Sequence, residues 1–337
     1  KDLQNLYSAS RTGNYPLMRS YSGTRDIFKM AEVLLRNINN AWCAVPLSWY
    51  NRLDGRGPRT LLESIKENQL LMKWHGDRNI PVEVNEAHHW SLRDAHDTIA
   101  VVMAYLAALN AKKMGVNTYI AQYMFNTPNG SSAKMDIAKM SAKKQLISRL
   151  EDNNFRVLTQ VRAGLTSFPV NLNKAKGQLA YATFLGMTID PDIVHVVAFS
   201  EADHAATSTD IIESCQIAQQ LINNLTYGSP EFMSDLQIIN RRDRLIKEAE
   251  VLIEAIKELA RNINANSDCL LTDPTVLEHA IRIGLIDAPH LKGNKEGAGK
   301  LTTKMIDGAC HAYDYQRDKI IYEKERIEKI HRRQYFE

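Results

Sequence analysis

Cysteine, net charge and long apolar runs are all scarce in this chain. The four cysteines lie far apart and form no CxxC pair, which indicates reduced core thiols rather than a disulfide framework. The net charge is only +3, with acids and bases well mixed. The composition therefore gives no indication of a nucleic-acid or anionic-membrane partner. No apolar run approaches the ~20 residues of a membrane span, and Lys1–Gln4 lacks the apolar stretch of a signal peptide. We therefore expect a cytoplasmic protein.

Six apolar runs with helical patterns between them predict a parallel α/β fold. The runs are Pro16–Ser22, Ala41–Leu47, Ile80–Asn85, Asn117–Met124, Phe155–Arg162 and Ile193–Phe199. Alternation of this kind, repeating about every 30–45 residues, is most often found in the closed (β/α)8 TIM-type barrel, and an open doubly wound sheet is the alternative. Because a closed barrel needs eight strands, we expect two more to precede residue 1.

Amphipathic segments between and after these runs predict the helices and the domain organisation. Those between the runs are Arg25–Asn37, Thr60–Trp74, Ser91–Met114, Ala133–Asp152, Leu172–Leu185 and Thr209–Asn224. After Pro230 the pattern changes to helices over Phe232–Asn264, Pro274–Gly284 and Tyr313–Gln334. We therefore expect parallel α/β barrel units over residues 1–230 and a C-terminal helical extension packed on the barrel over residues 231–337.

Polar and titratable side chains gather where each of the six runs ends. The sixth run, for example, passes directly into Ser200, Glu201, Asp203 and His204. Because the carboxyl ends of parallel strands meet at one rim, these groups are predicted to line a shared ligand site. Arginines at the rim favour a small carboxylate-bearing substrate, since a guanidinium pairs with a carboxylate through two hydrogen bonds. The candidate substrate-binding residues are Arg19, Tyr21, Arg52, His88, Asn126 and Arg162, and the candidate catalytic residues are Tyr50 and Glu86.

Three stretches of the chain have the pattern of a known family. They are Val161–Pro169 (VRAGLTSFP), Val194–Thr209, and Gly284–Pro289 (GLIDAP) followed by Gly297–Lys300 (GAGK). With weaker likeness over Pro16–Thr24 and Trp42–Asn51, the chain resembles the large, epsilon catalytic chain of glutamate mutase, an adenosylcobalamin-dependent enzyme. The resemblance covers roughly residues 15–310.

The resemblance implies a barrel whose mouth faces a cobalamin held by a separate corrinoid-binding Rossmann-like domain or subunit. In that family a deoxyadenosyl radical takes a hydrogen from the substrate, the substrate radical rearranges, and the hydrogen returns. An acid after the sixth strand holds the adenosyl ribose; Asp203 falls there with Glu201 close by, and a family lysine near the ribose falls on Phe199. Tyr50 falls on a substrate tyrosine and Arg19 lies near a substrate arginine.

Two departures from the family pattern concern the substrate. Tyr21–Thr24 stands where the family has Arg-His-Gly-Thr, and Val45–Ser48 has no match to its Glu-Gly-Gly-Gly stretch. We therefore expect a radical mutase whose substrate is a small carboxylate other than glutamate, in an oligomer. The alternatives are a metal-dependent TIM-barrel lyase or hydrolase using Glu86, His88 and the Asp203–His204 pair, and a non-catalytic barrel that holds a corrinoid protein.

Overall fold

The computed structural model describes residues 1–11, 17–21 and 23–334. Six strands form one parallel sheet in which each strand pairs with its successor along the chain. They are β1 (Arg19–Tyr21), β2 (Trp42–Pro46), β3 (Val82–Asn85), β4 (Thr118–Phe125), β5 (Arg156–Ala163) and β6 (Ile193–His195). Each strand overlaps one predicted run, so the prediction of six parallel strands is confirmed, although β6 ends at His195 and the predicted run at Phe199. Positions 16 and 22 of the first run lie outside the described residues.

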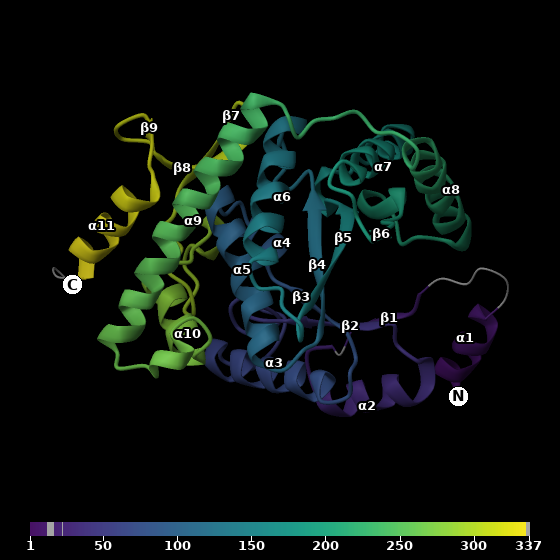
Figure 1. Ribbon diagram of the computed structural model, residues 1–337, viewed down its shortest axis with the longest axis horizontal. Coiled ribbons are helices and arrows are strands. Elements are labelled where there is room, and N and C mark those ends of the chain that lie inside the picture. Colours follow the sequence, from purple (N-terminus) through teal and green to yellow (C-terminus); the bar gives the residue numbers. More distant parts are fainter. Residues whose placement is uncertain (12–16, 22, 335–337) are drawn as a thin grey trace.

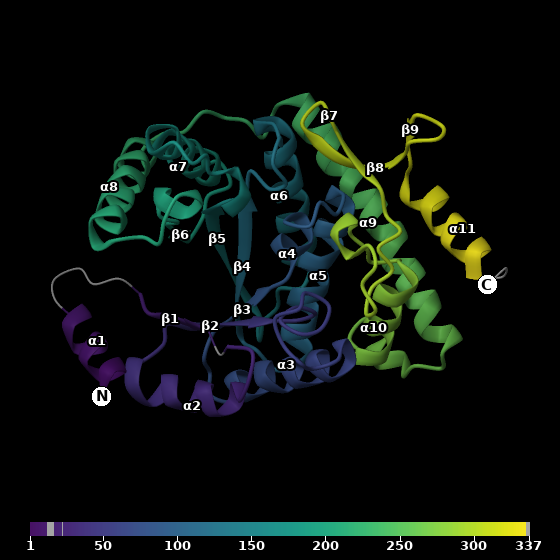
Figure 2. The same ribbon diagram turned by 180° about the vertical axis from the view of Figure 1, so that it is seen from behind.

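The sheet is strongly curled. In Figure 1 the strands β1 and β2 run almost across the direction of β4 and β5, and Figure 2 shows the same curl from behind. The result is a half-barrel with helices on its outer side. The described residues contain six parallel strands of this sheet, and a closed eight-stranded barrel remains a prediction.

Helices follow the strands as the alternation predicts, with one correction. They are α2 (Ile27–Ile38), α3 (Leu61–Gly76), α4 (Ala87–Ser91), α5 (Asp97–Lys113), α6 (Ala133–Ser148), α7 (Leu172–Met187) and α8 (Ser208–Leu225). The single helix predicted over Ser91–Met114 is wrong in its first part, because α4 ends and the chain turns through Asp94, whose φ is 59°, before α5 begins. An additional helix, α1 (Asp2–Ser10), was not predicted.

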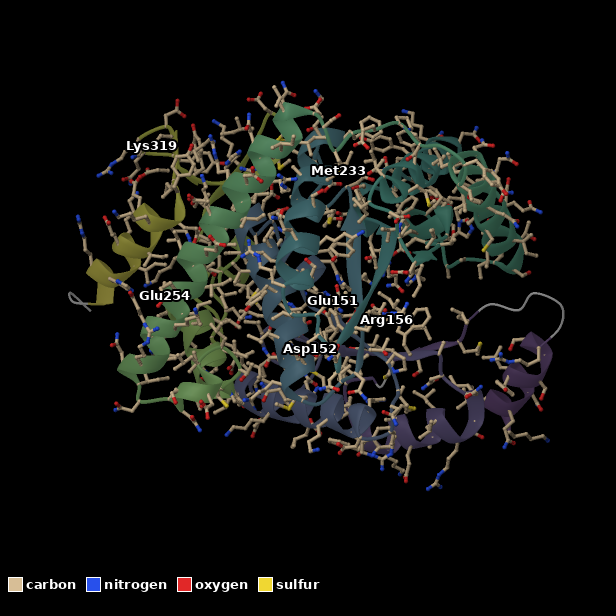
Figure 3. All side chains as sticks on the ribbon, viewed as in Figure 1. Glu151, Asp152, Arg156, Met233, Glu254 and Lys319 are labelled. Atoms are coloured by element: carbon tan, nitrogen blue, oxygen red, sulfur yellow. The ribbon has the colours of Figure 1, made fainter. Side chains whose placement is uncertain are left out.

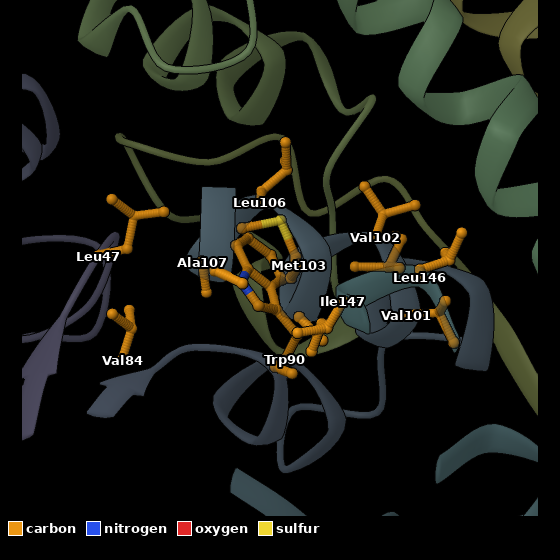
Figure 4. Packing of buried hydrophobic residues seen from close by; sticks show 14 of the residues in the cluster. Leu47, Val84, Trp90, Val101, Val102, Met103, Leu106, Ala107, Leu146 and Ile147 are labelled. Atoms are coloured by element: carbon orange, nitrogen blue, oxygen red, sulfur yellow. The ribbon is translucent and has the colours of Figure 1, made fainter. Parts of the chain in front are cut away.

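The outer face of the sheet is apolar and packs against the helices. Cys43 and Val45 of β2 and Val82 and Val84 of β3 belong to one cluster of buried residues. Figure 4 shows the centre of this cluster, where Trp90 lies among residues of α5 and α6. Because side chains alternate along a strand, the residues between these positions point to the opposite, inner face of the half-barrel.

The C-terminal part packs on the same core. Its helices are α9 (Leu236–Asn262), α10 (Pro274–Ile283) and α11 (Glu323–Gln334). Leu252 of α9 and Ile327 of α11 belong to the core cluster, and Met233, just before α9, has its sulfur 3.6 Å from the Ser141 hydroxyl of α6 (Figure 3). Within the described ranges, none of the helices has both the length and the apolar character needed to cross a membrane.

A small antiparallel sheet in the C-terminal part corrects the sequence-based expectation. It comprises β7 (Thr303–Ile306), β8 (Ala309–Asp314) and β9 (Lys319–Ile320). The helix predicted over Tyr313–Gln334 is therefore wrong over its first part and begins only at Glu323. Asp307 and Gly308 join β7 to β8 with φ values of 50° and 78°, and an Asp-Gly pair between apolar residues is a strong hairpin signal that the sequence already contained.

Candidate functional site

An ion pair lies at the centre of the inner face. Glu83 of β3 is fully buried, and the guanidinium of Arg19 of β1 donates to both of its oxygens, from Nε over 2.8 Å and from Nη2 over 2.7 Å. Removing two ions from water costs several kcal/mol of free energy per ion. Apolar side chains at the same positions would avoid this cost. The interior of a closed (β/α)8 barrel is usually filled with branched apolar side chains. A polar layer here therefore favours a ligand-binding role for the inner face.

Further donors complete the surroundings of the Glu83 carboxylate. Burial by itself raises the pKa of Glu83, but the charge of Arg19 and the hydrogen bonds to the carboxylate outweigh it, so that the pKa lies below its ordinary value. Glu83 is thus ionised and its oxygens are satisfied by protein donors. These donors are Trp42 Nε1 (2.9 Å), Gln122 Nε2 (2.6 Å), Gln160 Nε2 (3.2 Å) and, with its amide nitrogen turned toward Glu83, Asn85 Nδ2 (2.6 Å).

Arg162 of β5 is the second guanidinium of the inner face. Its Nε is buried, and the side chain has no hydrogen bond or ion pair to any residue in the described ranges. Burial and the charge of Arg19 lower the pKa of Arg162 to about 10, while Glu83 and Glu201 act in the opposite direction. At this pKa the side chain remains a cation at neutral pH. A partly buried cation that has no carboxylate partner in the protein can bind the anionic group of a ligand.

His195 of β6 lies beside Arg162, as its register partner in the sheet. Burial and the neighbouring Arg162 charge lower the pKa of His195 to about 3, so the imidazole is neutral. The side chain is partly exposed on the inner face. Arg162 therefore supplies the uncompensated positive charge of this region without help from histidine.

An aromatic group from β1 and the β2–α3 loop lies beside the ion pair. The ring of Tyr50 is 5.1 Å from that of Tyr21 and 5.3 Å from that of His89, measured between ring centroids, and Arg56 lies 4.8 Å over it. Tyr50 has a φ of 66°, a strained left-handed conformation for a large side chain. Strain of this kind persists where the surroundings fix it, often at a functional site.

His88 and His89 lie in the short helix α4. Both are buried, with ring centroids 4.4 Å apart. Burial holds the pKa of each well below the ordinary value, and the charge of Arg162 contributes to both shifts. The structure therefore brings His88 and the Tyr21–Tyr50 pair to the same region as Arg19 and Arg162, and both imidazoles there are neutral.

Two predicted site residues have their polar atoms engaged by the protein. The buried Glu86 carboxylate accepts hydrogen bonds from the backbone N–H groups of Leu47 and Ser48, from the Ser48 hydroxyl and from Trp90 Nε1 (2.8 Å). Asn126, with a φ of 56°, accepts from Gln178 Nε2 over 3.0 Å at its side-chain oxygen. Glu86 therefore ties the ends of β2 and β3 together, and Asn126 ties the end of β4 to α7.

Arg52 lies apart from the other predicted substrate-binding residues. Its side chain is exposed, and Nε donates to the carbonyl of Pro58 over 2.8 Å within its own loop. This hydrogen bond holds the 52–58 loop closed on itself. The structure therefore does not bring Arg52 to the inner face.

The rim after β6 carries the predicted cofactor-binding acids. Glu201 and Asp203 are exposed beside a hollow of about 270 Å³, which is lined by residues 198 and 200–206. His204 lies between two carboxylates, with Nδ1 2.7 Å from Asp203 and Nε2 3.1 Å from Asp210, and these hydrogen bonds raise its pKa. The Ser200 hydroxyl, at the base of the hollow, is buried without a hydrogen-bond partner among the described residues.

Phe199 differs from the other predicted cofactor-binding residues. Only 2% of it is exposed, and it packs in a small apolar cluster with Val197, Phe168 and Leu179. Lys176 Nζ lies 4.7 Å over its ring. Phe199 therefore supports the rim from below and presents no surface to a ligand in the hollow.

A larger hollow of about 680 Å³ lies far from this rim, between α10, α11 and the β8–β9 hairpin. Its charged side chains are paired within the protein, as Lys329 is with Asp314 (2.8 Å) and Arg326 with Glu323 (2.7 Å). Among its described lining residues there is no buried polar atom without a partner. The inner face, where Arg162 Nε is such an atom, is therefore the better candidate.

Metal ligation was considered for the second candidate function. Over the described ranges, His, Cys, Asp and Glu side chains form no group of three or more that could hold a metal ion. Glu86 and His88 lie at the end of β3, whereas Asp203 and His204 follow β6 and bond to one another. The geometry therefore offers no observation that favours the metal-dependent alternative.

The most specific stretch of the family resemblance forms one closed loop. Gly284 ends α10 with a φ of 88°, and the buried Asp287 carboxylate accepts hydrogen bonds from the backbone N–H groups of Gly299, Lys300 and Leu301, each over 2.8 Å. These bonds tie the GLIDAP and GAGK segments together. The loop belongs to the C-terminal part, and none of these bonds reaches the inner face.

The residue at the centre of the site, Glu83, was not predicted. The run Val82–Asn85 alternates apolar and polar residues, and that period-2 pattern was the signal for a polar inner face. Comparison with known proteins finds no protein family and no curated protein that matches this chain.

Proposed function

We propose that the inner face of the half-barrel binds the carboxylate of a small-molecule substrate at Arg162. The single observation that supports this is the Arg162 side chain, whose buried Nε has no protein partner, beside the satisfied Arg19–Glu83 pair. A carboxylate would restore both the charge balance and the missing hydrogen bonds of this guanidinium. Tyr21, Tyr50 and His88 would form the polar and aromatic walls around such a ligand.

The reaction we propose is a radical rearrangement, catalysed by this chain as the catalytic component of an adenosylcobalamin-dependent isomerase. The resemblance over Val161–Pro169 and Val194–Thr209 is the reason for this choice. Adenosylcobalamin, when bound, supplies the carbon radical that removes a hydrogen atom from a substrate. The contribution of this chain is to position the carboxylate at Arg162 and to exclude water from the inner face.

The residues at the β6 rim suit the adenosyl group in their chemistry. Ribose hydroxyls would donate to the carboxylates of Asp203 and Glu201, and the unpartnered Ser200 hydroxyl offers a further partner. Small residues lining the hollow, among them Ala202 and Ala205, leave room for a ligand. Phe199 has no part in this proposal.

Three further parts of the proposal follow from the resemblance and the sequence. The half-barrel is completed by two more strands into a closed (β/α)8 barrel, and the chain works in an oligomer with a corrinoid-binding domain or subunit. A reducing compartment such as the cytoplasm is supported by the four cysteines, none of which forms a disulfide. No membrane or nucleic-acid partner is proposed.

An adenosylcobalamin titration followed by visible absorbance tests the mutase proposal. We expect saturable binding only when a corrinoid-binding domain from the same genome is added to the full chain. Asp203→Ala should weaken that binding at least tenfold, while the control Glu258→Ala, at an exposed acid of α9, should leave it unchanged. Absence of binding with or without the partner would overturn the mutase proposal; binding that never leads to Co–C bond cleavage would favour the non-catalytic scaffold.

A second titration tests the carboxylate site independently of cobalamin. Calorimetry with propanoate, lactate and glutarate should detect binding of at least one acid to the chain, and Arg162→Met should abolish it. Binding that survives Arg162→Met would place the carboxylate elsewhere and contradict the proposal.

A further inference from the structure

Two glutamine side chains next to Glu83 each leave a buried hydrogen-bond acceptor unused. Gln122 and Gln160 are register partners on β4 and β5, and each Nε2 donates to the Glu83 carboxylate. Because a carboxylate only accepts hydrogen bonds, this contact fixes which end of each amide faces Glu83. The two Oε1 atoms therefore face away from Glu83, and neither has a hydrogen-bond partner in the described part of the chain.

Both of these unpartnered oxygens are buried. Gln122 is 7% exposed and Gln160 is fully buried. Buried polar atoms in proteins almost always have a partner, so two unpartnered oxygens on adjacent strands call for an explanation. Arg162 lies two residues beyond Gln160 on the same face of β5, about 6–7 Å further along the strand. The inner face thus offers two acceptors at one level and an anion-binding cation at the next.

The charge balance decides what kind of donor the two oxygens accept. Arg19 neutralises Glu83, whose oxygens are already satisfied, and Arg162 leaves one positive charge uncompensated. An ammonium group would bring a like charge close to two guanidinium groups and would find only neutral amide oxygens. Hydroxyl groups donate hydrogen bonds without adding charge, and each hydroxyl donates one.

We propose that the inner face selects a small acid carrying two hydroxyl groups, which donate to the Oε1 atoms of Gln122 and Gln160 while the carboxylate pairs with Arg162. This inference rests on the proposed function, since it takes the carboxylate site at Arg162 as given. Gln122 and Gln160 are then specificity-determining residues. The Arg19–Glu83 pair positions both amides by holding their Nε2 atoms.

Calorimetric titration of the full chain with a matched three-carbon series tests the proposal. The probes are propanoate, lactate, glycerate and alanine, which carry the same carboxylate and differ in hydroxyl and ammonium groups. We expect glycerate to bind at least tenfold more tightly than propanoate, with lactate between them, and alanine to bind more weakly than lactate. Equal affinities across the series, or a preference for alanine, would overturn the proposal.

Variants of the two amides locate the effect. Gln122→Met and Gln160→Met should each bring the affinity for glycerate to within about threefold of that for propanoate, whereas Gln219→Met, at an exposed position of α8, should change neither. If a variant does not fold, as judged by circular dichroism, the wild-type series still decides the outcome.

The result also separates this inference from the proposed function. Loss of all binding in Arg162→Met, with equal affinities for propanoate and glycerate in the wild type, would overturn the hydroxyl selection alone. No binding of any acid to the wild type would overturn the carboxylate site and the hydroxyl selection together.

Discussion

Arg19 and Glu83 form a bidentate ion pair that joins β1 to β3 across the intervening strand β2. Glu83 is fully buried, while 23% of the Arg19 side chain is exposed. The pair thus links strands that share no backbone hydrogen bonds. It also holds the donors around Glu83 in the arrangement on which the proposed ligand site depends.

Substitution Glu83→Gln should destabilise the protein by about 3 kcal/mol, since one partner of a buried pair is left uncompensated. Urea denaturation followed by circular dichroism measures the free energy of unfolding. The control is Glu250→Gln, whose exposed pair with Arg149 should contribute less than about 1 kcal/mol. An equal, small effect of both substitutions would show that the inner face is more hydrated than its burial indicates.

Substitution Lys139→Met should cost about 3–5 kcal/mol in the free energy of unfolding. The buried Lys139 ammonium lies 3.3 Å from Asp97 and 3.1 Å from Asp136 and donates to the carbonyl of Thr127 over 2.6 Å. Removing it leaves two buried carboxylates close together, with Arg241 bonded to Asp97 (2.8 Å) as the remaining cation. Thermal and urea unfolding measure the loss.

The matched control for that substitution is Lys174→Met on α7. Lys174 is exposed, so its replacement should change the free energy of unfolding by less than about 0.5 kcal/mol. A loss in Lys139→Met as small as that of the control would contradict the prediction.

Substitution Glu323→Gln should destabilise the protein at pH 7 and have little effect near pH 2. Burial raises the pKa of Glu323, but Arg326 and His96 outweigh it and lower the pKa from an ordinary 4.5 to about 2. Because the folded-state pKa is the lower one, the stabilisation is fully present above about pH 4.5 and is lost as the pH falls toward 2. Urea denaturation at several pH values should show a difference on the order of 2–3 kcal/mol at neutral pH that disappears in acid. A difference that stays constant from pH 7 to pH 2 would exclude this linkage.

Substitution Gly164→Ala should disturb the end of β4. A Cβ atom at Gly164 would meet the Thr127 hydroxyl and the carbonyl oxygens of Phe125 (2.5 Å) and Asn126 (2.8 Å). Relief of this overlap needs backbone movement, so we expect a loss of about 1–3 kcal/mol in the free energy of unfolding. The matched control is Gly177→Ala on α7, where nothing lies within 4 Å of the added Cβ and helix propensity should gain up to about 1 kcal/mol. Opposite signs for the two substitutions are the expected result, and equal signs would contradict it.

The strands of the half-barrel could be predicted because their signal is local. Runs such as Asn117–Met124 are apolar and bounded by turn residues, and they reappear as β4 and its neighbours. The β7–β8 hairpin was missed because its strands are short and partly polar, and the charged residues that follow have a helical pattern. The left-handed backbone of the Asp307-Gly308 turn reverses the chain, and this allows β7 and β8 to pair.

The structure brings some of the predicted site residues together and leaves others apart. Arg19, Arg162 and Tyr50 lie near one another as expected, because the carboxyl ends of parallel strands share a rim. Arg52 and Phe199 do not reach it, since one side chain turns into its own loop and the other packs into the core beneath the rim. Where such a side chain lies depends on the path of its loop, which cannot be predicted from the local sequence pattern.

The sequence by itself determined the alternation of strands and helices and which strand ends carry polar groups. These properties follow from hydrophobic period and chain connectivity, which act over a few residues. Only the tertiary structure decided that Glu83 is the common acceptor of the inner face and that Arg162 lacks a partner. Both depend on residues up to 77 positions apart, such as Gln160 and Glu83, being brought together by the curl of the sheet. The free energy of a buried charge depends on its neighbours in space, and these are determined by the packing of the whole chain.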